Sequence, residues 1–388
     1  MSKKMSFKIL FDQDLDSYLK SRVPGIKDYR VLSKSLDARG APRGKKPSYQ
    51  VTIEYVEYSE DFVKQSETFK KSTEQSKHFS NLLSQPIIIG AGPAGLFSAL
   101  RFAEYGVKTT IIERGDEANK RMLYISKYWR KGILNKDNNV CFGEGGAGLF
   151  SDGKLITRVK SPYIKYVMEK FVHFGAPAEV AYESNPHLGS NKIRKIISFI
   201  TAELKSVGHK ILYNTKVEKL LYEDDKVIGV ELTTGEKLFS DYIILATGHS
   251  AKEMYFHLEE NQVAMAQKDF AVGVRVEHPR SEIDKIQYGR YADTCDIGAA
   301  RYRLSYHNHD SEKGTYSFCM CPGGHVLSSG TDPDGIVANG MSNYSRSAPW
   351  SNSALVVSVQ RGKDLSLIHI SEPTRRTPIS YAVFCLKK

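Results

Sequence analysis

The sequence predicts an α/β protein with a parallel sheet in the middle of the chain and a smaller α+β unit on either side. Three neighbouring segments carry this prediction. Pro86–Gly90 is a short apolar run typical of a buried strand, Leu96–Tyr105 has helical spacing, and Val107–Glu113 is typical of the next strand. The three make one β-α-β unit, and the two strands of such a unit lie parallel in one sheet.

The unit before this sheet is expected to be small. A helix is expected over Asp14–Arg22, and strands over Tyr29–Ser35 and Tyr49–Tyr58, which are rich in β-forming residues. These elements place an α+β domain over residues 1–78. Residues 62–80 are polar and charged, which is typical of a helix or of a linker into the next domain.

The central domain is expected over residues 79–253. Residues 254–364 alternate short strands with glycine-rich turns, and we expect them to form an inserted α+β domain. The further elements expected in the central domain are a helix over 193–208, a strand over 210–213, a hairpin of 215–222 and 227–233, and a buried strand over 242–246.

Composition narrows the class of protein. The chain has 388 residues, of which 41% are hydrophobic and 26% charged, and no apolar run approaches the roughly 18 residues of a membrane helix. Acids directly follow the short apolar patch at the start, which argues against a signal peptide. Five irregularly spaced cysteines do not make a disulfide framework, so the sequence indicates a cytoplasmic location.

The formal net charge of +11 raises the question of nucleic-acid binding. The excess is spread along the chain, with one dense cluster between Arg39 and Lys46. A solvated face or an anion-binding loop explains this distribution more simply than a nucleic-acid groove. Nucleic acid is therefore not expected as a partner.

The last 24 residues have a different character. From Leu365 onward the amino-acid sequence resembles a translated sequencing-library adapter. It ends in two lysines, as the translation of a nucleotide homopolymer would. We expect residues 365–388 to be an artefact of this kind and the fold to be truncated at its C-terminal end near Asp364. The alternative is a genuine β-rich tail.

A phosphate-binding motif lies between the first two strands. The segment from Gly90 to Gly95 matches the GxGxxG motif. It follows an expected strand and lies at the start of an expected helix. In this context the first glycine permits a tight turn, the second lets a pyrophosphate approach the backbone, and the third lets helix and strand pack closely. The residues expected to contact the dinucleotide here are Gly90, Gly92, Pro93, Ala94 and Gly95.

The acid expected in such a site is also present. Glu113 ends the second strand, 23 residues past Gly90, where a carboxylate would accept hydrogen bonds from both hydroxyls of an adenosine ribose. The sequence therefore predicts a dinucleotide-binding domain with a Rossmann-like fold.

Two features resemble the two-dinucleotide-binding-domain flavoproteins and favour FAD over NAD. The first is Arg114 with Gly115 directly after the acid, and the second is the text Ala246-Thr247-Gly248 at the end of a strand. The resemblance implies that Arg114, Ala246, Thr247 and Gly248 lie at the cofactor and that Val217 meets the adenine through its backbone. No second GxGxxG occurs, so NAD(P)H either donates electrons at the flavin face without its own domain or is not the donor.

Four long segments carry a narrower resemblance, namely Phe142–Lys154, Asn185–Asn191, Phe318–Gly324 and Asn339–Ser342. It is to the uncharacterised FAD-dependent dehydrogenases of bacteria and extends from about residue 5 to Asp364. It implies an FAD-dependent oxidoreductase whose substrate domain is residues 254–364, here incomplete, because the Gly-Asp segment that closes the flavin site in such families is missing.

The glycine-rich loop 143–154 suits close approach to a flat ring or to phosphate. A cluster of structural turns is the alternative. If the loop does approach a flat ring or phosphate, the cofactor is expected to contact Gly145, Gly146, Ser151 and Asp152.

Two residues are candidates for catalysis. Lys154 could sit near the N1–C2 carbonyl region of a flavin and favour its anionic reduced form, or it could be a solvated lysine. His187 could donate a proton, because an imidazole titrates near neutrality, or it could cap a loop. No metal site is predicted.

Two further groups leave alternatives open. Arg275, His278 and Arg280 either bind an acidic substrate or form a salt-linked strand end. Cys319 and Cys321 are the one close cysteine pair of the sequence, and they are either buried structural residues or a reactive thiol near the substrate.

These features predict an FAD-dependent oxidoreductase that acts on a small organic substrate. The alternatives are a flavoprotein that acts on tRNA or another nucleic acid, and a non-catalytic FAD-binding module. The sequence does not indicate the substrate, the electron donor or the oligomeric state.

Overall fold

The parts of the chain described by the computed structural model are residues 2–26, 28–56, 84–157, 159–266, 268–294, 297–309, 313–332, 335, 337–360 and the backbone of 383–385. The expected helix or linker over 62–80 lies outside the described residues. So does the adapter-like segment 365–388, apart from the short strand noted below.

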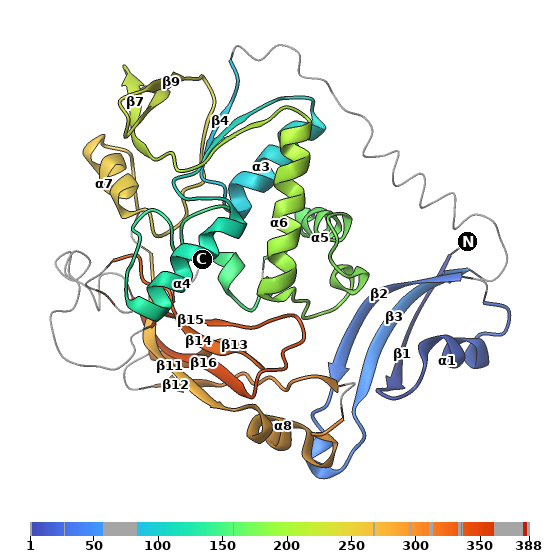
Figure 1. Cartoon of the computed structure of the whole chain (residues 1–388). Helices are drawn as coiled ribbons and strands as arrows, with labels where there is room; N and C mark the ends of the chain where they lie inside the picture. Colours follow the sequence, from blue (N-terminus) through green and yellow to red (C-terminus); the bar gives the residue numbers. More distant parts are fainter. Residues whose placement is uncertain are drawn as a thin grey trace.

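The N-terminal unit is a small α+β domain, as predicted. Its antiparallel sheet has the order β1-β3-β2, and in Figure 1 it lies to the side of the rest of the molecule. Asp14 caps the helix by accepting a hydrogen bond from Ser17 N at 2.8 Å, and Leu19 is buried against the sheet. The elements are β1 Lys3–Leu10, α1 Leu15–Arg22, β2 Asp28–Asp37, η1 Ala41–Arg43 and β3 Ser48–Val56.

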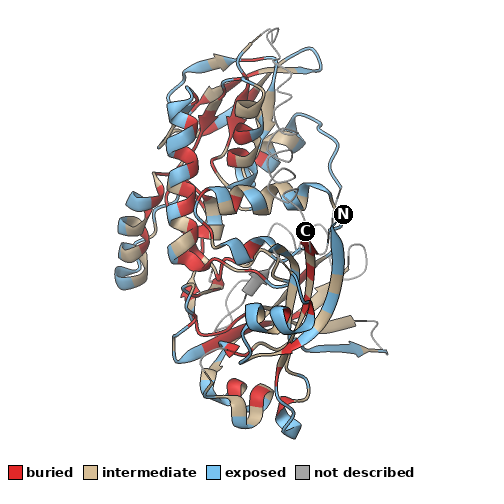
Figure 2. Ribbon diagram, turned by 90° about the vertical axis from the view of Figure 1, so that its right-hand side faces the viewer, coloured by how far each residue is buried: buried red, intermediate tan, exposed pale blue. Residues whose placement is uncertain are grey.

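The middle of the chain forms a parallel sheet with the order β10-β4-β5-β6, which confirms the predicted fold class. Helix α6 buries Ile193, Ile196, Ile197, Ile200 and Leu204, at the spacing of one helical face. Figure 2 shows the helices of this domain buried on one side and exposed on the other. The elements are β4 Ile87–Ile89, α3 Pro93–Glu104, β5 Thr110–Ile112, α4 Ala118–Lys131, η2 Gly146–Phe150, α5 Tyr163–His173, η3 Ala178–Ala181, α6 Gly189–Ser206, β6 Lys210–Leu212 and β10 Ile243–Leu245.

The predicted hairpin extends into a three-stranded antiparallel sheet that precedes β10 in the chain. It packs with β4, β5 and α7 around a second apolar cluster that includes Val217 and Val230. The elements are β7 Val217–Glu223, β8 Lys226–Leu232, β9 Lys237–Phe239 and α7 Lys252–Glu260.

The last part of the chain is a second large sheet with the order β12-β13-β16-β11-β17, and it lies below the parallel-sheet domain in Figure 1. The short strand β17 comes from the adapter-like segment, and its backbone pairs antiparallel with β11. The elements are β11 Phe270–Pro279, α8 Arg280–Tyr288, η4 Gly289–Tyr291, β12 Ser305–Asn308, β13 Lys313–Cys321, β14 His325–Ser328, β15 Ala338–Met341, β16 Trp350–Val359 and β17 Val383–Cys385.

Candidate functional site

The loop between β4 and α3 contains glycines with contrasting surroundings. Gly90 has φ +106°, and a Cβ there would come within 2.4 Å of the Ala246 carbonyl oxygen. A Cβ on Gly95 would come within 1.9 Å of the Gly90 oxygen. A Cβ on Gly92, in contrast, would meet no described atom within 4 Å. The backbone packing therefore requires glycine at 90 and 95, and the space beside Gly92 is open.

This open space lies at the start of α3. Gly92 is the N-cap residue, Pro93 and Ala94 begin the helix, and no described side chain caps it. The first N–H groups of a helix have no partner within it and carry the positive end of the helix dipole. The arrangement suits a negatively charged group such as a pyrophosphate.

The glycine-rich loop after β5 and α4 packs directly against the first loop. Gly145 N donates to the Ala91 oxygen at 2.8 Å, and a Cβ on Gly146 would lie 3.4 Å from both Gly92 Cα and Pro93 Cδ. The structure therefore brings together two glycine-rich segments that are about 50 residues apart in the sequence.

A buried arginine that the sequence analysis did not single out holds this second loop. Arg121 on α4 is 0% exposed, and its guanidinium donates to the carbonyl oxygens of residues 139, 140, 143, 144 and 146 at 2.6 to 3.4 Å. Burial lowers its pKa to about 10, so it stays charged at neutral pH. Arg121 lies three residues after Ala118 and four before Ile125, on the buried face of α4. This helical spacing is the sequence signal that could have indicated a buried arginine.

Glu113 connects the same segments. It is 5% exposed; Oε1 accepts hydrogen bonds from Gly115 N and Gly143 N at 2.9 Å, and Oε2 accepts one from Ala91 N at 2.8 Å. These bonds fix both glycine-rich loops at the end of β5. Since a carboxylate has about four acceptor sites, one remains on Oε2. The expected contact with a ribose therefore stays a prediction that relies on this remaining site.

Arg114 is used within the protein. Its guanidinium forms ion pairs with Asp137 and Glu253 and lies over the Phe142 ring, 4.1 Å from the ring centroid. It thus connects α7 to the loop that follows α4. A direct contact of Arg114 with a cofactor would require it to leave these partners.

The Ala246-Thr247-Gly248 segment lies beside the first loop. Ala246 N donates to the Ile89 oxygen at 2.9 Å. Gly248 has φ +74°, and a Cβ on it would meet no described atom within 4 Å. Val217 is buried. Two residues before it, the backbone N–H of Thr215 donates to the backbone carbonyl oxygen of Glu113 at 3.0 Å. Both fingerprints and the start of β7 therefore meet at the carboxyl ends of the parallel strands, where open α/β sheets bind their ligands.

Ser151 and Asp152 stabilise the end of the glycine-rich loop. Ser151 Oγ donates to the Gly148 oxygen and accepts from Gly153 N. Asp152 is 1% exposed and receives hydrogen bonds or ion pairs from Ser342 Oγ, Arg346 and Lys154.

Burial alone would raise the pKa of Asp152, but Lys154 and Arg346 lower it below the usual range for an aspartate. Arg346 reaches both carboxylate oxygens, Ser342 Oγ donates to Oδ1 and Lys154 Nζ pairs with Oδ2, so all four acceptor sites are used. Asp152 therefore connects the loop to the segment after β15. It has no acceptor site left for a cofactor hydroxyl.

His187 lies beside Lys154, since the two residues form an isolated antiparallel β-bridge. Its ring stacks on Tyr344 with centroids 5.2 Å apart, and its Nε2 donates to the Tyr344 oxygen at 2.9 Å. Burial, and then Arg346, lower its pKa to about 4. His187 is therefore neutral at neutral pH, which disfavours the expected role as a proton donor and leaves Nδ1 as an acceptor.

The side chains considered for an acidic substrate are engaged with protein partners. Arg275 donates to Asn352 Oδ1 at 2.7 Å and to the Cys319 oxygen at 2.8 Å. His278 Nδ1 lies 2.5 Å from the Ser351 oxygen, and Arg280 pairs with Asp284 at 3.3 Å. These contacts favour the alternative of a hydrogen-bonded and salt-linked strand end.

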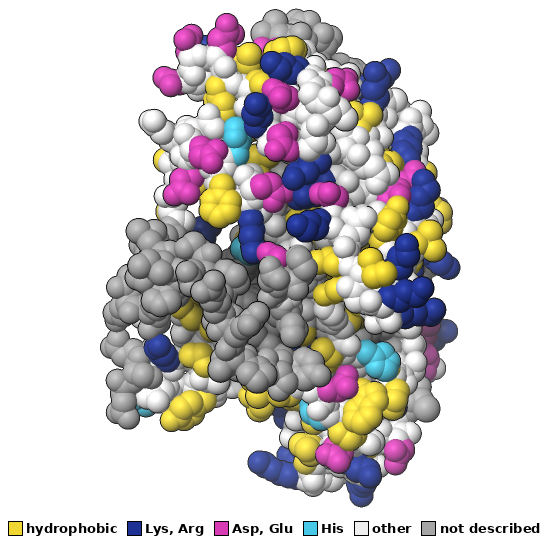
Figure 3. Space-filling view, turned by 60° about the vertical axis from the view of Figure 1, so that its left-hand side comes forward, with side chains coloured by type: hydrophobic (Ala, Val, Ile, Leu, Met, Phe, Trp, Pro, Cys, Tyr) yellow, Lys and Arg dark blue, Asp and Glu magenta, His cyan; other side chains and the backbone are white. Residues whose placement is uncertain are grey.

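Over the upper part of the face in Figure 3, Lys and Arg side chains are interspersed with Asp and Glu. Among the described residues no group of three His, Cys, Asp or Glu side chains is placed to hold a metal ion. The described helices include none with the length and apolar character needed to span a bilayer.

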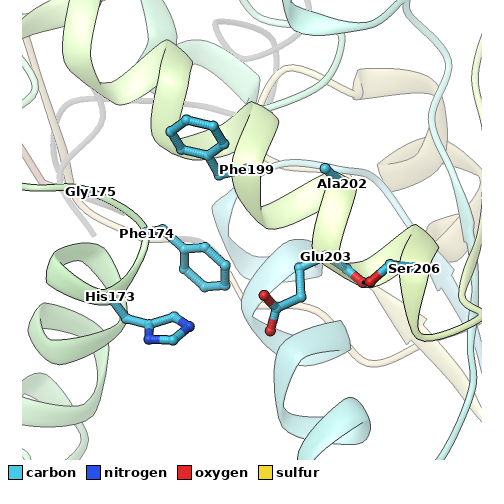
Figure 4. Close-up of a pocket in the computed structure, with 7 residues that line it drawn as sticks. All are labelled: His173, Phe174, Gly175, Phe199, Ala202, Glu203 and Ser206. Carbon is cyan, nitrogen blue, oxygen red and sulfur yellow. Dashed lines mark hydrogen bonds between the residues drawn. The ribbon is translucent and has the colours of Figure 1, made fainter.

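A separate hollow lies between the end of α5 and α6 (Figure 4). It is shallow and mainly apolar, and it includes none of the residues singled out above. Its lining residues are His173, Phe174, Gly175, Phe199, Ala202, Glu203 and Ser206.

Two family models match the chain. Residues 84–255 match the model described as HI0933-like protein Rossmann domain, and residues 269–373 match FAD-dependent protein, C-terminal domain-like. The central part of the chain is a Rossmann-like FAD-binding domain. This FAD-binding domain contains both glycine-rich loops and the Ala246-Thr247-Gly248 segment.

The chain is similar to several curated proteins. It is 41% identical over 297 residues to an uncharacterized protein of Clostridium beijerinckii, covering 76% of this chain and 54% of that protein. It is 26% identical over 206 residues to Protein FixC of Escherichia coli K12, covering 51% of this chain and 44% of that protein. The chain thus spans about half the length of the curated relatives it matches.

Two solved structures to which the chain has a low similarity are as follows. The flavin-dependent brominase Bmp2 is 10% identical with a TM-score of 0.37, covering 71% of this chain and 56% of that one. The glycerol-3-phosphate dehydrogenase of Bacillus halodurans, solved in complex with FAD, is 12% identical with a TM-score of 0.34, covering 76% and 51%.

Proposed function

We propose that the chain is part of an FAD-dependent oxidoreductase that acts on a small organic substrate. The observation that carries the proposal is the open space beside Gly92, bounded by Gly146 and the N-terminus of α3. A backbone left bare by glycine at a helix N-terminus is what a dinucleotide pyrophosphate requires.

The residues around this space fit FAD. The pyrophosphate would lie on Gly92, Pro93 and Ala94, and the remaining acceptor site of Glu113 would take a ribose hydroxyl. Val217 would meet the adenine through its backbone. The flavin end would extend past Gly145, Gly146, Thr247 and Gly248 toward Ser151 and Lys154.

When bound, FAD supplies an isoalloxazine ring that takes up or releases two electrons. The protein's contribution would be position and charge. Lys154 carries a positive charge next to the buried Asp152, and His187 is held neutral with Nδ1 free to accept a hydrogen bond. NAD(P)H is one candidate electron donor, docking at the flavin face.

Two other functions are less well supported. A flavoprotein that acts on tRNA or another nucleic acid would favour a continuous basic surface, and acidic side chains lie among the basic ones over the upper part of the face in Figure 3. A non-catalytic FAD-binding module would share the cofactor site. Steady turnover of an artificial electron acceptor with NAD(P)H would argue against such a module.

Replacement of Gly92 by valine tests the cofactor assignment. The backbone at Gly92 is extended, with φ −73° and ψ 179°, so valine fits the conformation and its side chain fills only the open space. We expect Gly92→Val to lose bound FAD while the melting temperature of the cofactor-free chain stays close to that of the wild type.

The matched control is Gly335→Val, because a Cβ on Gly335 also meets no described atom within 4 Å. It lies far from the glycine-rich loops in sequence, and it should keep the FAD content of the wild type. Full FAD occupancy in Gly92→Val, measured by absorbance after gel filtration, would disprove the assignment of this space to the pyrophosphate.

A further inference from the structure

Strand β13 ends in a cysteine pair with an irregular backbone. The pairing of β13 with β16 is regular up to Phe318 opposite Ala354, and it resumes at Cys321 opposite Asn352 after a register shift. Cys319, within the shift, has φ +49°, which is rare for a residue with a side chain. Bulges and strained backbone of this kind are enriched at functional sites.

Two cations converge on the second cysteine of the pair. Arg275 Nη2 lies 3.3 Å and Lys154 Nζ 3.6 Å from Cys321 Sγ. Arg275 is itself buried and held by Asn352 and by the Cys319 oxygen. Cys321 Sγ therefore lies in an electropositive environment, and the same two cations favour a negative charge on the neighbouring Cys319.

The two thiols differ in access and in charge. Cys319 is partly exposed, whereas Cys321 is buried close to Gly340, where a Cβ would come within 2.7 Å of its sulfur. A hydrogen bond from Cys321, helped by Lys154 and Arg275 against the effect of burial, lowers the pKa of Cys319 to about 5. The same interaction, together with burial, raises the pKa of Cys321 well above the usual thiol range.

We propose that Cys319 and Cys321 form a redox dithiol that reduces small-molecule disulfides, with Cys319 as the attacking thiolate and Cys321 as the resolving thiol. The partly exposed position of Cys319 allows a disulfide to reach it. Cys321 needs no access to solvent, because it attacks a bond that Cys319 already carries. Lys154 and Arg275 keep the negative charge on the pair.

The exchange balances without a further reactant. The Cys319 thiolate attacks one sulfur of the disulfide R–S–S–R, forming a mixed disulfide and releasing one thiolate RS⁻. Cys321 then gives its proton to solvent and attacks Cys319 Sγ, which forms the Cys319–Cys321 disulfide and releases the second RS⁻. The two protein thiols lose two electrons in total, and the small disulfide gains them.

The test treats the full chain, without added flavin, with 5,5′-dithiobis(2-nitrobenzoate), whose released thiolate is coloured. Trypsin yields the peptide 314–346, which contains Cys319 and Cys321 and none of the other three cysteines. We expect this peptide to lose two hydrogen atoms and to carry no nitrobenzoate adduct. A persistent adduct on the wild-type peptide would contradict the proposal, because it would show that Cys321 does not resolve the mixed disulfide.

Single variants separate the roles of the two thiols. Cys321→Ser should keep the adduct on Cys319, and Cys319→Ser should leave Cys321 unmodified. Cys141→Ser is the matched control, because Cys141 is a free cysteine whose pKa is raised by burial. The result on peptide 314–346 should be the same in this variant as in the wild type.

The pH dependence distinguishes a reactive pair from merely accessible thiols. The rate at Cys319 should change little between about pH 6 and pH 8, whereas the rate at an ordinary thiol rises about tenfold per unit over that range. The rate at Cys319 should fall at low pH as its thiolate becomes protonated. In Lys154→Met this fall should occur at a higher pH, because Lys154 helps to lower the pKa of Cys319. A wild-type rate at Cys319 that rises tenfold per unit would overturn the assignment. Because the test needs no flavin, its outcome is independent of the proposed FAD site.

Discussion

At the scale of single residues, glycines of the same motif have different roles. Gly90 and Gly95 are required by contacts within the protein, whereas Gly92 faces open space. The two carboxylates of the site also differ, since Glu113 keeps one acceptor site and Asp152 keeps none. The sequence motif identifies the positions, but it does not reveal the partners that come from distant segments, such as Ala246 beside Gly90, Gly143 at Glu113 and Arg346 at Asp152.

His187 gives a prediction about pH. Its pKa is lowered from 6.5 to about 4, so the unfolded chain binds a proton in this range that the folded chain does not. The stabilisation is complete above about pH 6.5 and is lost as the pH falls toward about 4. With allowance for partial exposure, the loss is about 2 kcal/mol.

His187→Gln should remove this part of the pH dependence, because glutamine can still donate to the Tyr344 oxygen and does not titrate. Urea unfolding of the flavin-free chain at several pH values measures the difference. If the free energy of unfolding changed equally with pH in the wild type and in His187→Gln between about pH 4 and pH 6.5, the lowered pKa of His187 would be contradicted.

At the scale of secondary structure, the sequence predicts the elements whose periodicity is uninterrupted. The isoleucine runs of β4 and β5, the glycine loop and the apolar face of α6 were all found. Helices α4 and α5 were missed. The buried face of α4 contains Arg121, which interrupts the apolar pattern, and α5 buries only Phe171. The Arg121 contacts form only after the chain has folded, so local pattern alone does not reveal them.

Arg121→Met should destabilise the chain by about 3 kcal/mol or more, because several buried carbonyl groups would lose their donor. The loop 139–146 should also bind FAD more weakly. Arg130→Met on the exposed side of the same helix is the control and should change the free energy of unfolding by less than about 0.5 kcal/mol. Equal effects of the two substitutions in urea unfolding would contradict the role of Arg121.

At the scale of the whole molecule, the buried pair of Asp152 and Arg346 joins the FAD-binding domain to the segment between β15 and β16. Arg346 is 5% exposed and follows β15, while Asp152 ends the glycine-rich loop. The sequence predicted both units. It did not predict this connection, because Asp152 resembled a cofactor contact and Arg346 carried no motif.

Asp152→Ala should destabilise the chain by about 3–5 kcal/mol, since it leaves Arg346 buried without its carboxylate. The double variant Asp152→Ala with Arg346→Met should recover part of this loss. Additive effects in a double-mutant cycle, measured by chemical denaturation, would show that the two residues do not act as a pair.

The central claim is that FAD lies in the space between the two glycine-rich loops. Hydrogen exchange of the backbone amides, with and without FAD, tests it most directly. We predict that FAD slows exchange in residues 91–96 and 143–148 and leaves the N-terminal sheet and the α5–α6 hollow unchanged. Binding of FAD with protection confined to other segments, and none in these two loops, would contradict the account.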